Sequence, residues 1–398
     1  MKEWKTYRIG DICKTNSSQY SPKEAWDEFL YLDTGNITRN IIEDIVRYSS
    51  AAELPSRARR KVVNDDIIFS TVRPNQCHFG ILSNPPANLL VSTGFTVITA
   101  NTKIVDPYYL YYYLTQDSIV DYLHSIGEQA VSAYPSIKAQ DIEDIEIELP
   151  DLSTQNNIAK TLRALDNKIQ LNRQINDNLE QQAQALYKSW FIDNYQTEWP
   201  EYSLDEVTLK ITDGVHNTVI DTPNGEYYLL SCKNIKNRRL NMSSSDRRID
   251  EGTFNKLRKR TMLSKGDILL SSVGTIGELM LLNDDPHNYE FQRSVAIIKP
   301  NPVYISSYYL YETLISQIDK ITNTAHGAVQ QCIFLSDLKE YTINIADKAL
   351  ISRYDIIVKP FFDEITKREK EIARLTSLRD SLLPKLMSGE LKINEIDC

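Results

Sequence analysis

Residues Asp65–Val72 read DDIIFSTV, and residues Gly266–Val273 read GDILLSSV. Other stretches recur in the same order: Tyr31–Ile37 (YLDTGNI) returns as Leu229–Ile235 (LLSCKNI), and Tyr108–Leu114 (YYLYYYL) returns as Tyr308–Leu314 (YYLYETL). The offset between paired stretches drifts from 198 to 201 and then to 200, as insertions in loops would produce. A period this long exceeds that of solenoid repeats. It indicates duplication of a whole domain, which makes the chain a covalent pseudo-dimer with approximate two-fold symmetry.

Length and composition place the chain among ordinary globular proteins. Its 398 residues allow two or three domains that each bury a core. The hydrophobic share of 41% and the charged share of 25% are typical of globular proteins. The first ten residues do not resemble a signal peptide, and no apolar run is long enough to cross a bilayer. We therefore expect a cytoplasmic protein without a membrane partner.

The motifs of common catalytic and metal sites are absent from the sequence. The cysteines Cys13, Cys77, Cys232, Cys332 and Cys398 are scattered and form no Cys-x-x-Cys pair, so neither a disulfide framework nor a zinc site is indicated. No phosphate-binding loop, dinucleotide fingerprint or nucleophile triad stands out. We expect a chain that binds no metal or cofactor and catalyses no reaction itself.

The charge distribution favours a nucleic-acid ligand, although the net charge is −9. Asp141–Glu198 carries 11 acidic and 5 basic residues, whereas Lys233–Arg260 carries 10 basic and 3 acidic residues. The first copy has a shorter basic cluster of Arg57, Arg59, Arg60 and Lys61. One charge run is often only a solvated surface. Basic clusters in the same half of both copies favour a DNA-binding surface.

The first part of each copy is predicted to hold short β-strands and one helix. Asp66–Ser70 and Phe95–Ile98 are brief runs rich in β-branched and aromatic residues. Tyr108–Leu123 follows with apolar residues at helical spacing. Because the tyrosine-rich segment occurs in both copies, we interpret it as structural rather than as a platform for stacking bases.

After Pro150 the pattern changes to a heptad seam. Steps of four and three connect Ile158, Leu162, Leu165, Ile169, Asn172, Asn176, Leu179, Ala183, Leu186 and Trp190. The second copy ends in the same way, with Phe361, Ile365, Arg368, Ile372, Leu375, Arg379, Leu382 and Leu386, before Pro384 and Gly389 are expected to close the helix. Two such seams should pack on each other, with the polar members fixing the register. The alternative is two amphipathic helices that each lie on their own domain, but a helix of about 50 Å is longer than a small domain.

Asn84-Pro85-Pro86-Ala87 resembles the Asn-Pro-Pro-aromatic motif of adenine-N6 methyltransferases, in which the aromatic stacks on a flipped base. Here Ala87 replaces the aromatic, and no glycine-rich cofactor motif precedes the tetrapeptide. A proline-rich turn between strands explains these residues better.

The chain as a whole resembles the specificity subunit of a Type I restriction-modification system. The resemblance rests on Leu149–Leu162 (LPDLSTQNNIAKTL), Leu165–Ile169 (LDNKI), Tyr187–Phe191 (YKSWF) and Leu378–Leu391 (LRDSLLPKLMSGEL). The second copy departs from it at Asp347–Ser352, which lacks the Pro-Leu-x-x-Gln pattern of the first. The start of the second helix is therefore the less secure of the two.

The resemblance implies an α+β fold of two tandem mixed α/β target recognition domains, each followed by a long helix. The two helices would pair as an antiparallel coiled coil with pseudo-two-fold symmetry. The expected boundaries are 1–150 and 196–350 for the recognition domains, 151–195 and 351–391 for the helices, and 392–398 for a tail.

The resemblance also implies partners. Each recognition domain would read half of a bipartite, asymmetric site on double-stranded DNA, and the coiled coil would set the gap between the halves. Two methyltransferase subunits and restriction or translocase subunits would dock on the chain. These partners, rather than this chain, would hold S-adenosylmethionine, ATP and magnesium.

Features that differ between the copies are candidates for reading two different half-sites. Arg, Asn and Gln suit contacts with base edges, whereas Lys more often holds phosphate. The candidate DNA-binding residues are Arg57, Arg59, Arg60, Lys61, Arg73, Asn75, Gln76 and Gln129 in the first copy, and Lys236, Arg238, Arg239, Thr275, Arg293 and Gln330 in the second. The candidate coiled-coil and partner interface comprises Leu162, Leu165, Ile169, Asn172, Asn176, Leu179, Leu186, Trp190, Ile365, Ile372, Leu375, Leu382 and Leu386.

Two other functions stay open on the sequence alone. A stand-alone adenine methyltransferase would transfer methyl groups without partners. A coiled-coil scaffold would fail to shift duplex DNA even with a methyltransferase present.

Overall fold

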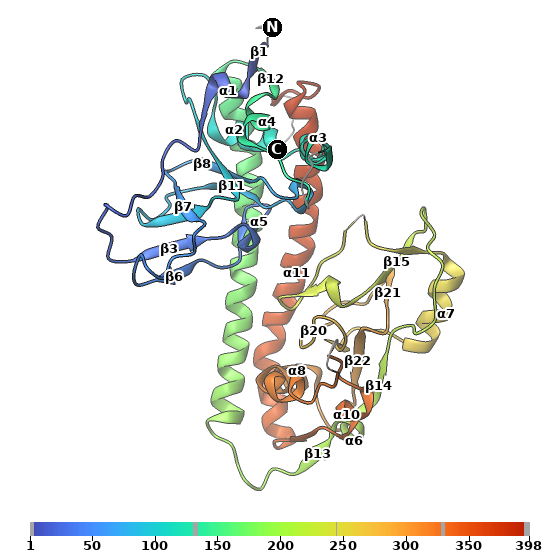
Figure 1. Cartoon of the computed structure of the whole chain (residues 1–398). Coiled ribbons are helices and arrows are strands. Elements are labelled where there is room, and N and C mark those ends of the chain that lie inside the picture. Colours follow the sequence, from blue (N-terminus) through green and yellow to red (C-terminus); the bar gives the residue numbers. More distant parts are fainter. Residues whose placement is uncertain (1–3, 130–133, 244, 328–330, 394–398) are drawn as a thin grey trace. The chain divides into compact units, whose positions relative to one another are not determined.

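The structure, a computed structural model, describes residues 4–129, 134–243, 245–327 and 331–393 (Figure 1). These residues form two compact units. The first comprises residues 1–170 and 373–398, and the second comprises residues 171–372. Each unit therefore contains one mixed α/β domain and a segment of both long helices.

The first unit is built from short strands and helices in the expected places. Its strands are β1 (Lys5–Arg8), β2 (Cys13–Thr15), β3 (Phe29–Leu32), β4 (Ile37–Thr38), β5 (Ile41–Ile42), β6 (Val46–Tyr48), β7 (Ala58–Lys61), β8 (Asp66–Ser70), β9 (Phe79–Leu82), β10 (Leu89–Ser92), β11 (Phe95–Ala100) and β12 (Glu146–Leu149). Its helices are α1 (Ile9–Ile12), η1 (Thr34–Asn36), η2 (Pro74–Gln76), α2 (Pro107–Leu114), α3 (Asp117–Gln129) and α4 (Ala139–Glu143). The strands predicted at Asp66–Ser70 and Phe95–Ile98 are confirmed as β8 and most of β11.

The second unit repeats this order with two exceptions. Its strands are β13 (Glu201–Ser203), β14 (Thr208–Asp213), β15 (Tyr227–Leu230), β16 (Ile235–Lys236), β17 (Arg239–Leu240), β18 (Arg248–Ile249), β19 (Ile268–Ser271), β20 (Leu279–Leu281), β21 (Tyr289–Phe291), β22 (Val295–Pro300) and β23 (Thr342–Asn344). Its helices are α6 (Leu204–Val207), η4 (Cys232–Asn234), α7 (Glu251–Thr261), α8 (Ser307–Ser316), α9 (Ile318–Thr322) and α10 (Leu335–Glu340). The strand β7 is exchanged for the helix α7, and η2 has no counterpart between β19 and β20.

The sheets confirm the duplication. The order β2-β11-β8-β9 in the first unit corresponds to β14-β22-β19-β20 in the second. In both units one pair of strands is parallel, β3 with β10 and β15 with β21. The antiparallel pairs β1-β12 and β13-β23 each join the start of a domain to its end. Because β12 and β23 lead directly into the long helices, these pairs fix where each helix leaves its domain.

The long helices are α5 (Leu152–Tyr187), which continues into a π-helical turn η3 (Lys188–Ile192), and α11 (Lys348–Met387). Pro384 was expected to close the second helix, but it lies inside α11. Proline removes only one hydrogen bond so close to a helix end, and Ser388 N still donates to Pro384 O at 3.0 Å. The helix ends at Met387, two residues before Gly389, whose φ of 73° breaks it.

The tyrosine-rich segment is two helices rather than one, and the same break occurs in both units. Asp106 and Ser306 cap α2 and α8 by accepting from Tyr109 N at 2.9 Å and Tyr309 N at 3.1 Å. α2 ends at Leu114 and α3 begins at Asp117, while α8 ends at Ser316 and α9 begins at Ile318. The prediction of one helix over Tyr108–Leu123 was therefore wrong between Leu114 and Asp117.

Both long helices supply residues to both domain cores. Ile158 and Leu162 of α5 and Leu386 of α11 lie in the main core cluster of the first unit. Ala183 of α5 and Ile365 of α11 lie in that of the second. Both interpretations of the heptad pattern are therefore correct in part. Within each unit the two helices pack on each other, and they also pack on the domain of that unit.

Polar heptad residues pair the helices within each unit. Asn172 Nδ2 donates to Glu371 Oε2 at 2.9 Å, and Arg368 Nη1 donates to Asn172 Oδ1 at 2.9 Å. In the first unit Arg379 Nη1 donates to Asp166 Oδ1 at 2.7 Å. Pairs in which one number rises as the other falls indicate antiparallel helices.

Asn172 and Asn176 provide a matched test of these polar positions. Both are buried, at 0% and 1% exposure, but among the described residues neither amide atom of Asn176 has a hydrogen-bond partner. Asn172→Ala should lower the free energy of unfolding by about 1–3 kcal/mol because it removes the hydrogen bonds of Asn172 to Arg368 and Glu371. Asn176→Leu should be neutral or stabilising, since it removes polar atoms without partners. Thermal unfolding of the full chain checks both, and equal losses at the two positions would contradict the assignment.

Candidate nucleic-acid interface

In the first unit four of the predicted base-reading residues belong to two adjacent segments. The turn η2, which holds Asn75 and Gln76, contacts α3, and Arg73 N donates to Pro135 O at 2.9 Å. The Arg73 guanidinium lies 4.7 Å from the centroid of the Tyr134 ring, a cation–π contact that orients it. Asn75, Gln76 and Gln129 are exposed. This cluster combines one arginine with three amides on a surface open to a ligand.

The basic cluster at β7 divides into outward and inward residues. Arg57 and Arg59 are exposed. Lys61 Nζ lies 2.7 Å from Glu24 Oε2 and 5.5 Å from the centroid of the Trp26 ring. The Arg60 guanidinium donates to the side chain of Asn16 and to the carbonyl of Phe95, and burial lowers the pKa of Arg60. Arg60 and Lys61 therefore have structural partners, while Arg57 and Arg59 face solvent.

The second unit places its predicted residues in two groups. The first is built like the cluster around Arg73, because Val72 and Val273 form equivalent β-bridges, with Ser136 and Cys332 respectively. Thr275, two residues after Val273, and Arg293 are both exposed. The charge of Arg293 acts to lower the pKa of Cys332, but burial raises that pKa by more. Gln330 lies outside the described residues.

The second group is the hairpin β16–β17, whose arginines bind the long helices. Asn237 and Arg238 form its turn, with φ of 51° and 63°. The Arg239 guanidinium pairs with Glu180 of α5, and its Nε lies 3.0 Å from Glu369 Oε1 of α11. Arg238 Nη1 lies 3.6 Å from Glu180 Oε2. The structure thus gives Arg239 a positioning role, and contact of Arg238, Arg239 or the exposed Lys236 with DNA stays a prediction.

Charges in this hairpin contact shift one another's pKa values. Burial acts to lower the pKa of Arg239, but Glu180 and Glu369 outweigh it, so the pKa is raised. Burial raises the pKa of Glu180 and of Glu369, against the attraction of Arg239. A buried ion pair of this kind contributes more to geometry than to net stability.

All residues predicted for the coiled coil are buried or half-buried. The buried ones are Leu162, Ile169, Asn172, Asn176, Ile365, Leu375 and Leu386, and the half-buried ones are Leu165, Leu179, Leu186, Trp190, Ile372 and Leu382. These residues are therefore engaged within the chain. Whether any of them also contacts a partner subunit stays a prediction.

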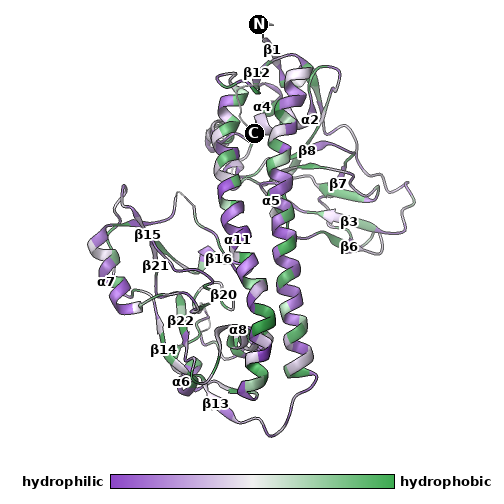
Figure 2. Ribbon diagram, turned by 180° about the vertical axis from the view of Figure 1, so that it is seen from behind, coloured by the Kyte–Doolittle hydropathy of each residue, from purple (hydrophilic) through white to green (hydrophobic). Residues whose placement is uncertain are grey.

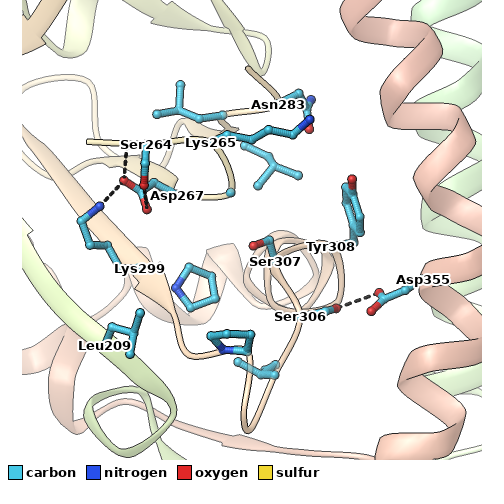
Figure 3. Close-up of a pocket in the computed structure, with 16 residues that line it drawn as sticks. Leu209, Ser264, Lys265, Asp267, Asn283, Lys299, Ser306, Ser307, Tyr308 and Asp355 are labelled. Atoms are coloured by element: carbon cyan, nitrogen blue, oxygen red, sulfur yellow. Dashed lines mark hydrogen bonds and ion pairs between the residues drawn. The ribbon is translucent and has the colours of Figure 1, made fainter. Parts of the chain in front are cut away.

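A cavity of about 450 Å³ in the second unit is lined by polar groups that are already paired (Figure 3). Lys299 Nζ donates to Asp267 Oδ2 at the back of the cavity, and Ser264 N donates to the same oxygen at 2.9 Å. Ser306 Oγ donates to Asp355 Oδ1 of α11 at 2.7 Å. We assign these groups to holding α8 and the sheet in place rather than to a ligand.

Other kinds of site find no support in the described part of the chain. It contains no cluster of three or more His, Cys, Asp or Glu side chains arranged to hold a metal ion. None of the described helices is both long and apolar enough to span a bilayer. Asn84 begins an exposed turn between β9 and β10, with φ of 48°, as the structural reading of Asn84–Ala87 predicted.

Comparison with known proteins finds similarity to one family. Residues 1–181 match the model of the Type I restriction modification DNA specificity domain. The chain is 34% identical over 193 residues to the HindI specificity subunit of Haemophilus influenzae, covering 48% of this chain and 42% of that protein. It is 25% identical to the MjaIX specificity subunit of Methanocaldococcus jannaschii over 99% of this chain and 95% of that one.

The chain is therefore similar to the specificity subunits of Type I restriction systems, with the family model matching its first 181 residues. Its fold also matches the crystal structure of a Type I S subunit from M. genitalium, with a TM-score of 0.53, 14% identity and coverage of 96% of both chains. The match to the HindI subunit spans less than half of that protein.

The recurrence of an arginine at position 260 is the sequence signal that assigns Arg60 to the scaffold. Arg260 lies two hundred residues after Arg60. Its guanidinium donates to Asp213 O at 2.7 Å and also to Gly214 O. Arg60 binds the equivalent turn at Asn16. Residues that differ between the copies are the candidates for reading DNA. An arginine that occurs in both copies is therefore assigned to the scaffold.

Glu312 of α8 is a buried carboxyl beside the hairpin contact. It is 1% exposed, and burial together with the charge of Glu180 raises its pKa to about 8 despite the attraction of Arg238. Its Oε1 has no hydrogen-bond partner among the described residues. The equivalent position in the first unit is Tyr112, whose hydroxyl donates to Asp166 at 2.6 Å.

Glu312 should make stability depend on pH. Between its ordinary value near 4.5 and about 8 the folded state holds a proton that the unfolded state has lost, so the free energy of unfolding falls as pH rises through this window. Glu312→Gln should remove that fall and gain stability relative to the wild type at pH 8.5. Urea unfolding of both proteins at pH 6 and pH 8.5 measures the effect; parallel curves would show that Glu312 does not titrate there.

Proposed function

We propose that this chain is the DNA-reading subunit of a Type I restriction-modification complex, in which each recognition domain reads one half of a bipartite, asymmetric site. The similarity of the chain to Type I specificity subunits supports this role. The duplication is the observation that supports recognition of two different half-sites. The same scaffold occurs twice in the chain, while the exposed basic and amide residues differ between the two copies. Identical domains would be expected to read identical halves.

The proposed readers of the first half-site are Arg73, Asn75, Gln76 and Gln129, flanked by Arg57 and Arg59. Arg can pair with guanine, and Asn and Gln with adenine, in the major groove, while the flanking arginines suit phosphates. For the second half-site the corresponding candidates are Thr275, Arg293 and Gln330, with Lys236 for phosphate contact. Holding Arg73 against Tyr134 reduces the entropy lost when its guanidinium meets a base.

The proposed partners are two methyltransferase subunits and the restriction or translocase subunits, assembled along the long helices. In this proposal S-adenosylmethionine, ATP and magnesium act on those partners, and this chain supplies only recognition and positioning. The complex would work in the cytoplasm, where its DNA lies. The alternatives of a stand-alone methyltransferase and of a scaffold that never binds DNA receive no support from the family.

Arg73→Ala tests the proposed reader in the first domain. Loss of a bidentate contact typically costs about 1–3 kcal/mol, so we expect roughly tenfold weaker binding of the cognate duplex by the complex with its methyltransferase subunits. Fluorescence anisotropy at fixed salt measures it. Arg47→Ala is the matched control, because Arg47 is an exposed arginine of the same domain that pairs with Glu28 at 2.8 Å. Equal affinities for Arg73→Ala and the wild type would remove this loop from the interface.

A further inference from the structure

The segment between β18 and β19 differs in structure from its counterpart in the first unit. Between β6 and β8 the first unit has a turn followed by β7, which pairs with β10. Between β18 and β19 the second unit has α7. The second-last residue of each element is an arginine, Arg60 or Arg260, that binds the turn after the first strand of the main sheet. One position of the scaffold therefore carries two unlike elements held by the same anchor.

One side of α7 is packed into the domain. Phe254, Leu257 and Thr261 are buried, and the Phe254 ring stacks on Tyr227 with centroids 4.1 Å apart. Phe254 and Leu257 share a core cluster with Leu229 and Ile249. This apolar side accounts for the stability of the helix.

Polar bonds fix α7 beyond its apolar contacts. Arg258 pairs with the fully buried Glu290 and donates to Pro286 O at 2.7 Å and to Tyr289 O at 2.9 Å. Thr261 Oγ1 donates to Glu290 Oε2 at 3.0 Å. At the N-terminus Asp250 caps the helix by accepting from Thr253 N at 2.8 Å. A short helix held in this way presents its outer side in a defined orientation.

The outer side of α7 is a continuous polar stripe of Gly252, Asn255, Lys256 and Lys259, all exposed. Their spacing of three, one and three residues puts them on one face, opposite the buried side chains. No acidic residue belongs to the stripe, since Glu251 points about 100° away from Gly252. Figure 2 shows hydrophilic residues along most of α7. At the N-terminal end of the stripe the carboxylate of Asp250, the N-cap of α7, lies beside Gly252.

We infer that α7 is a DNA-reading helix of the second domain, which enters the major groove with the stripe Gly252, Asn255, Lys256 and Lys259. This inference rests on the proposed function and adds residues to it. The major groove of B-DNA admits an α-helix. The positive charge of the stripe complements the phosphates, and Asn255 precedes both lysines on the same face, where its amide can pair with the N6 and N7 of an adenine.

The two kinds of side chain predict different effects. Asn255→Ala should relax the preference for one base in one half of the bipartite site by roughly tenfold, without changing the other half. Lys256→Ala and Lys259→Ala should weaken binding to all sequences alike, each lowering the slope of log affinity against log salt by about 0.9. In the first domain Arg59→Ala, from the equivalent segment, should affect binding through the other half-site.

The experiment uses the complex of the full chain with its methyltransferase subunits. Methylation of a DNA library with randomised half-sites gives the base preferences, and anisotropy titrations at several salt concentrations give the slopes. Lys265→Ala is the matched control, because Lys265 is an exposed lysine of the same domain outside α7, and it should retain the wild-type motif and slope. Thermal melts establish that each variant is folded.

The outcomes separate the inference from the proposed function. A wild-type complex that methylates a bipartite motif, together with an Asn255→Ala variant that keeps every base preference, would overturn α7 as a reader and leave the proposed function intact. If the salt slopes of both lysine variants stay unchanged, the proposed phosphate contacts of α7 are overturned, and the proposed function again stays intact. A wild-type complex without sequence preference would instead overturn the proposed function.

Discussion

Each recognition domain completes its hydrophobic core with residues from both long helices, and the rest of the structure depends on this constraint. In the second unit Ala183 and Tyr187 of α5 meet Tyr354, Val358 and Phe362 of α11 in one core cluster. Removing either helix would expose a large part of that core to water. A reading surface is therefore fixed, within its unit, to the helices that carry it.

Acidic residues on the long helices help to hold the domains and the helices together within each unit. The excess of acidic residues over Asp141–Glu198 first indicates only a surface unsuited to DNA. Within the units, Asp166 binds Arg379, and Glu180 binds Arg238 and Arg239. The carboxylates thus hold arginines of the neighbouring helix or hairpin.

The sequence repeat predicted most of the fold, because a duplicated domain repeats its strand pattern and its heptads. It could not predict the break after Leu114 or the continuation of α11 through Pro384, which lies close to the helix end. Individual site residues were harder to predict, because composition does not tell which arginine points inward. Arg57 and Arg60 belong to one basic run, yet only Arg57 faces solvent. The pattern of α7 was likewise hidden in a charge run, because its stripe becomes visible only once the segment is known to be a helix.

The central claim is that two unlike readers share one scaffold, and the methylation pattern of cells that express the complex tests it most directly. The account predicts a bipartite adenine-methylated motif with two different halves, which disappears when this chain is deleted and the methyltransferase subunits remain. A motif that persists without the chain, or one whose halves are identical, would contradict it.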